Sequence, residues 1–327
     1  MVFPSSGNLS DPERPHVVAV IVTFNPDLPT LQTMIESLQA QVSRTVIVDN
    51  GSAGHIAEQI EQLALRHVCV LEALEANLGI AAAQNRGLAV AARVESDRPG
   101  HHHYVLFLDH DSIPASGMVE KLVATDVKLR RQNVSVGAVG PVVIDRRTGT
   151  HGRFVRAGRL WLSRVHCADN CSELAVDFLI SSGTLVRGDV LQEVGGMNEG
   201  LFIDHVDTDW CLRASAAKYR LFAVCGAHLT HSLGDEVVRV WLGRWREVFV
   251  HSPIRDYYMC RNTLLILKAI QMPLAWRLFL IVRLIGSIVF FGLGMAPRWI
   301  RLRRMFQGLL DGVNGRSGVL DVSLRPR

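Results

Sequence analysis

The sequence lacks the short patterns that would assign it to several large enzyme classes. It has no G-x-G-x-x-G segment and no G-K-[ST] segment, so the dinucleotide-binding and P-loop patterns are absent. A net charge of +4 over 327 residues is too small to indicate a nucleic-acid-binding protein. No internal repeat is visible, which argues against solenoids and propellers. We therefore expect no nucleic acid among its partners.

Cysteine is also scarce. The six cysteines are scattered at positions 69, 167, 171, 211, 225 and 260. A chain of this length can bury a sufficient core without cross-links, so we expect reduced thiols in a reducing compartment. His166, Cys167 and Cys171 could begin a zinc site, but no second ligand pair follows at finger-like spacing. Residues 1–15 lack the apolar segment of a secretory signal and predict a disordered tail.

Short β-branched runs alternate with amphipathic segments from residue 17 to residue 111. The predicted strands are 17–23, 45–48, 68–71, 104–108 and 136–143, and the predicted helices are 31–41, 56–66, 80–94 and 118–132. This alternation predicts an α/β fold, doubly wound around a mainly parallel sheet. Residues 145–175 look irregular, and a helix at 206–218 and a strand at 220–225 follow.

Polar side chains follow three of the predicted strands directly. Thr23 and Asn25 follow the first strand, Asp49 and Asn50 the second, and Asp109 and Asp111 the fourth. Ligands of doubly wound sheets bind at the carboxyl ends of the strands. The sequence therefore predicts a binding site formed by these three clusters.

Asp109 and Asp111 are candidate ligands of a divalent cation. Two carboxylates one residue apart at a strand end can reach the same Mg²⁺ or Mn²⁺, which leaves other coordination positions for diphosphate oxygens. The pair alone is a weak signal, because such spacing also occurs in ordinary turns. His231, which follows the predicted strand 220–225, could be a third ligand, although a single histidine is more often structural.

Other residues near the strand ends are candidates for nucleotide binding. Asp49 could accept hydrogen bonds from a base or a ribose hydroxyl, or it could only stabilise a turn with Asn50. Asn77 could cap the helix that follows Gly79, and the first amides of that helix could donate to an anion. Asn85 lies in the same helix, among small residues.

Three carboxylates crowd the start of the predicted helix 206–218. Asp204, Asp207 and Asp209 could simply favour the helix N-terminus, and Asp209 could pair with Arg213. Asp207 and Asp209 are two residues apart on a helix, so at most one of them points into a site. Asp207 or Asp204 is then the candidate general base.

Several stretches of the sequence resemble the family 2 glycosyltransferases, and among them the bacterial rhamnosyltransferases of polysaccharide assembly. The matching segments are VVAVIVTFNP, VIVDNGS, NLGIAAAQNRG, FLDHDS, the long segment from FLISSG to DTDWCLRA, HSLGD and YYMCRN. They occur in the same order as in the family and cover roughly residues 17–262. Many relatives carry an acidic pair where Val206 precedes Asp207 here.

The resemblance implies a GT-A fold, Mg²⁺ or Mn²⁺ as cofactor, and inversion at the anomeric carbon by single displacement. It implies that Asp207 is the base, that Asp109, Asp111 and His231 hold the metal, and that Asp49 contacts the nucleotide base. The other residues implied at the nucleotide are Thr23, Asn25, Asn50, Asn77, Gly79, Asn85 and Asp109. Those implied near the acceptor are Ser182, Gly183, Asp204, Asp209 and Trp210, with either Asp204 or Asp209 supporting the base.

The implied donor is dTDP-L-rhamnose, and the implied acceptor is a glycan or a lipid-linked glycan. Alternatives are another nucleotide sugar, such as UDP-galactofuranose or a UDP-hexose, and a non-catalytic partner in glycan assembly. A sugar nucleotidyltransferase is disfavoured because Thr23–Pro26 replaces the basic, glycine-rich phosphate loop expected after the first strand.

The predicted GT-A catalytic domain covers residues 16–240, with a nucleotide-sugar half at 16–111 and an acceptor half at 112–240. Residues 241–327 are predicted to be helical and membrane-associating. Leu278–Ala296 is nearly all apolar but contains Arg283, and a run of arginines begins at Arg298. An interfacial anchor is favoured over a core helix and a spanning helix. We therefore expect a cytoplasmic protein, peripheral at the inner face of the cell membrane; a homo-oligomer is left open.

Overall fold

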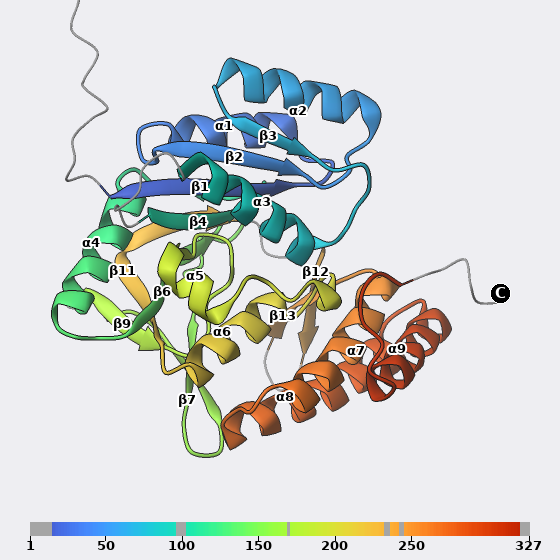
Figure 1. The fold of residues 1–327 in the computed structure, drawn as a ribbon. Coiled ribbons are helices and arrows are strands. Elements are labelled where there is room, and N and C mark those ends of the chain that lie inside the picture. The colour runs from blue at the N-terminus through green and yellow to red at the C-terminus, as the bar shows by residue number, and fades with distance from the viewer. Residues whose placement is uncertain (1–14, 96–102, 169–170, 232–235, 242–244, 321–327) are drawn as a thin grey trace, which may run out of the picture.

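A computed structural model describes residues 15–95, 103–168, 171–231, 236–241 and 245–320. Nearly all of the predicted tail at 1–15 lies outside these ranges. The described residues form one large sheet covered by helices, with a group of helices at the C-terminus (Figure 1).

The large sheet has nine strands and is mainly parallel. Its strands are β1 (His16–Thr23), β2 (Arg44–Asp49), β3 (Val70–Ala73), β4 (His103–Asp109), β5 (Ile113–Pro114), β6 (Val136–Asp145), β9 (Glu173–Val176), β10 (Leu185–Arg187) and β11 (Arg220–His231). The order is β3-β2-β1-β4-β10-β6-β11-β5, and β9 pairs with β11. β10 runs antiparallel to β4 and β6, while β1 to β4 are parallel to one another and β6 is parallel to β11.

Helices cover both faces of this sheet, which confirms the doubly wound prediction. One face carries α1 (Leu28–Leu38), α2 (Gly54–Arg66) and α4 (Met118–Arg131), and the other carries α3 (Ile80–Glu95), α5 (Gly188–Val194) and α6 (Val206–Ala216). Residues of β1 alternate between the two resulting cores, as expected for a buried strand with a two-residue repeat. The close approach of α3 to β1 requires a glycine, because a Cβ at Gly87 would lie 2.2 Å from a methyl group of Val20.

The region predicted to be irregular contains a hairpin. β7 (Phe154–Ala157) pairs with β8 (Leu162–Val165), and β9 then joins the large sheet. The strands of the hairpin are four residues long, and only Phe154 among their side chains is buried. A periodic apolar pattern is therefore absent, which is why the sequence did not reveal them.

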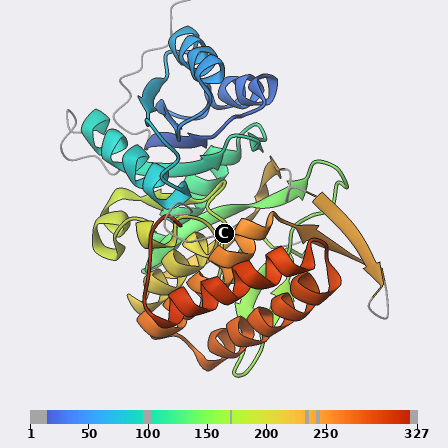
Figure 2. The ribbon, with the colours of Figure 1, turned by 90° about the vertical axis from the view of Figure 1, so that its right-hand side faces the viewer.

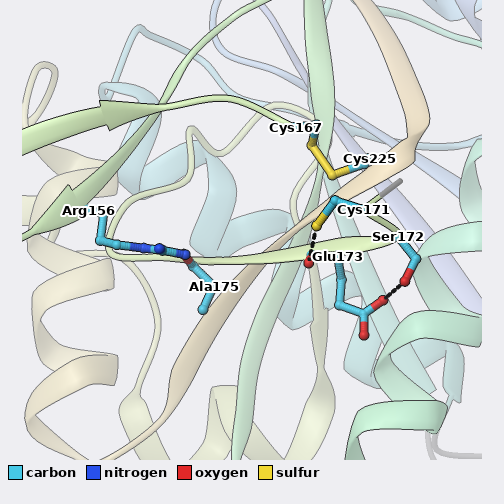
Figure 3. The surroundings of a disulfide bond; sticks show 7 residues. All are labelled: Arg156, Cys167, Cys171, Ser172, Glu173, Ala175 and Cys225. Carbon is cyan, nitrogen blue, oxygen red and sulfur yellow. Dashed lines mark hydrogen bonds between the residues drawn. A yellow bond between two sulfur atoms is a disulfide. The ribbon is translucent and has the colours of Figure 1, made fainter. Parts of the chain in front are cut away.

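A disulfide joins Cys167, just after β8, to Cys225 in β11 (Figure 3). The expectation that all six thiols are reduced is therefore wrong for this pair. The two residues are separated by 58 positions, and only the fold brings their Cα atoms to 5.6 Å. The other four cysteines are free. Zinc binding by His166, Cys167 and Cys171 is not supported, since the sulfur of Cys167 is already bonded.

The C-terminal part begins with a second hairpin and continues as helices. The elements are β12 (Glu236–Trp241), β13 (Trp245–Val250), α7 (Pro253–Ala269), α8 (Leu274–Ser287), the π-helical η2 (Ile288–Gly294) and α9 (Arg298–Val313). The boundary predicted at residue 240 thus falls inside β12. Figure 2 shows α9 packed along α7. Their contact contains a buried ion pair between Arg301 and Asp256, with nitrogen and oxygen 2.6 Å apart.

Candidate active site

Asp109 ends β4, and a turn carries the chain on to Asp111. Ser112 closes the turn by donating its amide to the carbonyl of Asp109 at 3.1 Å. Both carboxylates are partly exposed, whereas Ser112 is fully buried. The backbone of β4 therefore presents the two acidic side chains at the carboxyl end of the strand, as the sequence predicted.

A buried hydrogen-bond network supports this turn from below. The amide of Asp109 donates to Oγ of Ser182 at 3.1 Å, and Oγ of Ser182 lies 2.6 Å from Oγ of Ser112. Ser112 Oγ lies in turn 2.9 Å from Nδ1 of His231. Ser182 is 1% exposed, so it supports the acidic turn rather than facing an acceptor. Gly183 is also structural, because its φ of +86° and its contact with Pro141 leave no room for a side chain.

His231 reaches the acidic turn because β11 is longer than predicted. After an irregularity between Val224 and His228, β11 pairs with β6 again as far as His231. Nδ1 of His231 lies 3.1 Å from Oδ1 of Asp111. His231, which the sequence placed after the strand, is therefore the last residue of β11 and lies beside the turn of Asp109 and Asp111.

The charges of this pair stabilise each other. Burial raises the pKa of Asp111, but the hydrogen bond and charge of His231 outweigh it and hold the pKa below its ordinary value. For His231, burial lowers the pKa, and the hydrogen bond and charge of Asp111 outweigh it, so the pKa lies above its ordinary value. The pKa of Asp109 is raised, mainly by burial and further by the charge of Asp111, against the opposing effect of His231.

Asp207 lies in the first turn of α6 and points toward the same place. Ser181, through its backbone and its side chain, lowers the pKa of this carboxylate. Burial, followed by the charge of Asp109, raises the pKa of Asp207 to about 7. The structure therefore brings carboxylates from β4 and α6, 98 residues apart in the sequence, within range of each other's charge.

The loop before Asp207 has an unusual backbone and is held by α7. Phe202, Asp204 and His205 all have positive φ angles, of 65°, 62° and 64°. The side-chain nitrogen of Asn262, Nδ2, lies 2.8–3.0 Å from the carbonyl oxygens of residues 201, 203 and 204. Nε2 of His205 lies 3.0 Å from the hydroxyl of Thr263. Helix α7 therefore fixes the approach to the candidate base.

Two further side chains of α7 act on the same loop. The guanidinium of Arg261 is almost fully buried and donates to the carbonyl oxygens of Gly200 and Leu201 at 2.9 and 3.0 Å. Arg255, at the start of α7, holds both carboxylate oxygens of Asp204. Asp204 is thus engaged by an ion pair. The sequence signal for this support was the segment YYMCRN, whose role could not be read from composition.

Asp209 and Trp210 have structural partners. The carboxylate of Asp209 is 2% exposed and accepts from Arg213 at 2.7 Å, the ion pair considered from the sequence, and from Asn198 at 3.2 Å. This arrangement turns Asp209 away from an acceptor and from Asp207. The indole nitrogen of Trp210 donates to the carbonyl of Gly195. With Asp207, Trp210 lines a cavity of about 10 Å³, roughly room for one water molecule.

On the nucleotide side, the ends of β1 and β2 are joined through Asp49. Its carboxylate accepts from the hydroxyl of Thr23 at 3.1 Å and from both the amide and the hydroxyl of Ser52. Asp49 is 3% exposed and Thr23 is fully buried. Asn25 closes the same turn by accepting the amide of Ala53 at 2.9 Å. These residues lie together as predicted, and their bonds to one another order the loops at the strand ends.

The segment before α3 connects the nucleotide side to the loop before Asp207. Asn50 and Asn77 bond to each other through their side chains, and Asn77 accepts the amide of Gly79 at 2.9 Å. Asn77 therefore orders the turn before α3 instead of capping the helix itself. A Cβ at Gly79, where φ is +89°, would lie 2.5 Å from the carbonyl oxygen of Phe202. The two loops are in direct contact.

Asn85 continues this connection one turn into α3. Its side-chain amide donates to the carbonyl of Met197 and to Glu199, and its oxygen accepts the amide of Met197. Glu199 begins the short helix η1 (Glu199–Leu201), which precedes the strained loop. Asn85 therefore positions this segment, and its side chain is already occupied.

The donor set suits a hard divalent cation, although the ligands are not gathered around one point. In the described ranges, no three His, Cys, Asp or Glu side chains are placed to share a metal ion. Asp109 and Asp111 offer carboxylate oxygens, and Nε2 of His231 is directed away from the bonds made by Nδ1. The repulsion of Asp109 by Asp111, and of Asp207 by Asp109, also favours a cation beside them.

Comparison with known proteins agrees with this geometry. The family model "Glycosyl transferase family 2" matches residues 18–195. The dTDP-rhamnosyl transferase RfbF of Shigella flexneri is 30% identical over 307 residues, which are 93% of this chain and 97% of that protein.

Two solved structures share the fold. GalNAc-T7, solved with UDP, GalNAc and Mn²⁺, has a TM-score of 0.55 and 14% identity, and the match covers 86% of this chain and 58% of that one. For TarS of S. aureus the TM-score is 0.50 and the identity 14%, with coverage of 92% and 49%. The chain thus spans about half the length of these two structures, and the likeness shows a GT-A fold. The chain belongs to glycosyl transferase family 2 and is a glycosyltransferase.

Proposed function

We propose that this protein transfers L-rhamnose from dTDP-L-rhamnose to a glycan or lipid-linked glycan, with inversion at the anomeric carbon, in the synthesis of cell-surface polysaccharide. The similarity to the dTDP-rhamnosyl transferase of Shigella flexneri, over nearly the full length of both proteins, supports the donor. The observation that carries the reaction is the placement of Asp207, in the first turn of α6, within range of the charge of Asp109 at the end of β4.

Asp207 is the proposed general base. The acceptor hydroxyl gives its proton to the Asp207 carboxylate as its oxygen bonds to the anomeric carbon, and the bond from that carbon to the diphosphate oxygen breaks. Without a bound cation the pKa of Asp207 is about 7, and burial, the first cause of this rise, makes the carboxylate a better proton acceptor than an ordinary aspartate. Polar groups of Ser181 favour the ionised form of this carboxylate and so oppose part of the rise in its pKa.

Asp109 and Asp111, with His231, are the residues that would hold Mg²⁺ or Mn²⁺ together with the donor diphosphate. When bound, such an ion supplies Lewis-acid stabilisation of the negative charge on the departing diphosphate. Ser112 and Ser182 keep the acidic turn in place from beneath. The loops at Asp49 and Asn77 are proposed to receive the nucleoside, as expected at the carboxyl ends of parallel strands.

A donor panel tests this proposal. The purified protein is incubated with Mg²⁺ or Mn²⁺ and with dTDP-L-rhamnose, UDP-galactofuranose or a UDP-hexose, and its thermal unfolding is followed. A ligand present at 100 times its Kd stabilises the folded state by about 2.7 kcal/mol. We expect the largest shift with dTDP-L-rhamnose, and only in the presence of the metal. A larger shift with a UDP-sugar would refute the donor assignment.

A transfer assay tests the acceptor class. Wild-type protein with dTDP-L-rhamnose is offered a free oligosaccharide and a lipid-linked oligosaccharide, and product is separated by mass. Transfer to either substrate, lost in Asp111→Ala, supports the reaction. Release of free rhamnose alone, with no glycan product, would contradict glycan transfer.

A further inference from the structure

α8 and η2 form a continuous helical segment with an exposed apolar side. Leu274–Gly294 is 21 residues long, has a mean hydropathy of 2.0, and only 22% of its most apolar stretch is buried. The exposed large side chains form what we call the apolar face: Leu274, Ile281, Val282, Ile285, Val289 and Leu293. Five of these six are more than half exposed, which is unusual for so many neighbouring apolar side chains on a folded protein.

The opposite side of the same helix is already covered by the protein. Trp276, Leu280 and Leu284 are buried, and the ring of Trp276 lies 6.4 Å from that of Phe178. A surface helix normally turns a polar side to solvent when its apolar side is buried. Because α8 is apolar on both sides, packing within the chain accounts for only one of them, and the apolar face needs another partner.

The charges around the apolar face indicate what this partner is. No aspartate or glutamate occurs between Asp256 and Asp311, whereas the same stretch contains eight lysines and arginines. Arg277 and Arg298, near the two ends of the apolar face, are both exposed. A surface that is apolar in the middle and cationic at its edges complements a bilayer that contains anionic lipids.

Two neighbouring segments extend this surface with tryptophan. Figures 1 and 2 both place the β7–β8 hairpin beside α8, and its turn exposes Leu160 and Trp161. The first turn of α9, just after η2, contains Trp299, which is 84% exposed, and the exposed Ile300. Tryptophan is enriched at the level of lipid headgroups, where its ring and its N–H are both accommodated.

We propose that the apolar face of α8 and η2, with Trp161 and Trp299 beside it, docks the protein onto an anionic lipid bilayer. The helix lies along the surface and inserts only its outer side chains. Arg277 and Arg298 complete the attachment by contacting the anionic lipid headgroups.

The fold favours lying on the membrane over crossing it. To span a bilayer, α8 would have to leave the protein and expose the buried Trp276 and Leu280. Spanning would also draw Arg283, whose charge is within range of that of Asp204, into the hydrocarbon. An interfacial position keeps both the covered side of α8 and the surroundings of Arg283 as they are.

The test measures binding of the full-length protein to vesicles by flotation. Vesicles of phosphatidylcholine alone are compared with vesicles in which about one third of the lipid is phosphatidylglycerol. We expect binding to the anionic vesicles to be at least about tenfold stronger, and to weaken at high salt. Val282→Ser/Ile285→Ser/Val289→Ser should reduce this binding at least about tenfold, because it removes three inserted side chains.

Two further variants keep the test decisive. Arg277→Gln/Arg298→Gln should weaken binding to anionic vesicles about tenfold and leave binding to pure phosphatidylcholine unchanged. Leu65→Ser removes a side chain that is 75% exposed on α2, far from α8, and should bind as the wild type does. Unfolding curves of all variants verify that they fold; should the triple variant unfold, the arginine pair carries the test.

Three results would overturn the proposal. The first is wild-type binding in both the triple variant and the arginine variant. The second is retention of the protein in vesicles after alkaline carbonate extraction, which would show a spanning helix. The third is that the wild type is a dimer and the triple variant a monomer, while both bind vesicles equally. A second copy of the chain would then cover the apolar face. None of these measurements uses rhamnosyl transfer, so they stand or fall apart from the proposed function.

Discussion

Replacing Asp207 by asparagine should abolish transfer and, at the same time, stabilise the protein. The pKa of Asp207 is about 7, some three units above its ordinary value of 3.8, because its charge is buried beside Asp109. Each unit corresponds to 1.36 kcal/mol, so the ionised side chain destabilises the native state by at most about 4 kcal/mol. Asparagine has nearly the same shape as aspartate and removes the charge.

The sign of this effect depends on pH. Between pH 4 and pH 7 the native protein keeps a proton on Asp207 that the unfolded chain has lost, so the stability of the wild type falls as pH rises through this window. Near pH 4, both side chains are neutral and the two proteins should be equally stable. At pH 8 the variant should be more stable, by up to about 6 °C in Tm for a chain of 327 residues. Partial exposure of Asp207 makes this an upper bound.

Thermal unfolding in EDTA, from pH 4 to pH 8, measures the stability difference, and transfer assays with Mg²⁺ or Mn²⁺ measure activity. EDTA is needed because a bound cation would relieve the repulsion between Asp207 and Asp109. Asp209→Asn is the matched control: it breaks a buried ion pair with Arg213 and should lower the Tm at pH 8. Robust transfer by Asp207→Asn would refute the base assignment. A Tm difference that does not change with pH would refute the buried-charge reasoning.

Three other substitutions follow from the structure. Cys167→Ser should lower the free energy of unfolding by about 4 kcal/mol, which is the loop-closure value for 58 residues, and only in oxidising buffer. Cys171→Ser, which removes a free thiol, is the control. An equal loss in Cys171→Ser, or no loss in Cys167→Ser, would contradict this prediction. Asp111→Ala should weaken metal-dependent binding of dTDP, measured by calorimetry with and without Mg²⁺; a Kd equal to that of the wild type would remove Asp111 from the metal site. Gly79→Ala should lower the free energy of unfolding by at least about 1 kcal/mol in urea titrations, because the alanine would need a positive φ and would clash with the backbone of Phe202. Gly54→Ala, at an exposed glycine with free space around it, is the control and should be tolerated. Equal tolerance at Gly79 would argue against this packing.

The sequence predicted those parts of the fold that depend on local patterns. The β-branched run at 17–23 became β1 with one added residue, and the helix at 80–94 became α3 with one added residue. It failed at 145–175, where short strands gain stability from a disulfide and from pairing across the chain. Local periodicity carries no information about such partners.

The candidate site shows the same division. That Asp109 and Asp207 lie together could be anticipated, because one follows a parallel strand and the other starts a helix with a known family pattern. Ser112 and Arg255 could not be anticipated, since they act through partners 70 and 51 residues away in the sequence. A serine and an arginine have no distinguishing pattern of their own; only their place in the fold gives them a role.

The support of the Asp207 loop by Asn262 leads to the last prediction. Positive φ angles at Phe202, Asp204 and His205 each cost about 1–3 kcal/mol, so the loop persists only if its surroundings hold it. The two N–H bonds of the buried Asn262 amide are shared among the carbonyl oxygens of residues 201, 203 and 204. Asn262→Ala leaves these carbonyl oxygens without that donor, which should lower the free energy of unfolding by about 1–3 kcal/mol.

If the loop relaxes in this variant, Asp207 loses its position relative to the acceptor, while the hydrogen bonds within the nucleotide loops at Asp49 and Asn77 do not involve Asn262. We therefore expect kcat to fall by about two orders of magnitude, as small displacements of catalytic groups can cause, with the KM for the donor nearly unchanged. Asn314→Ala, an exposed asparagine after α9, is the matched control. A rise in donor KM with an unchanged kcat would mean that α7 supports the nucleotide side instead, and that the orientation of Asp207 does not depend on Asn262.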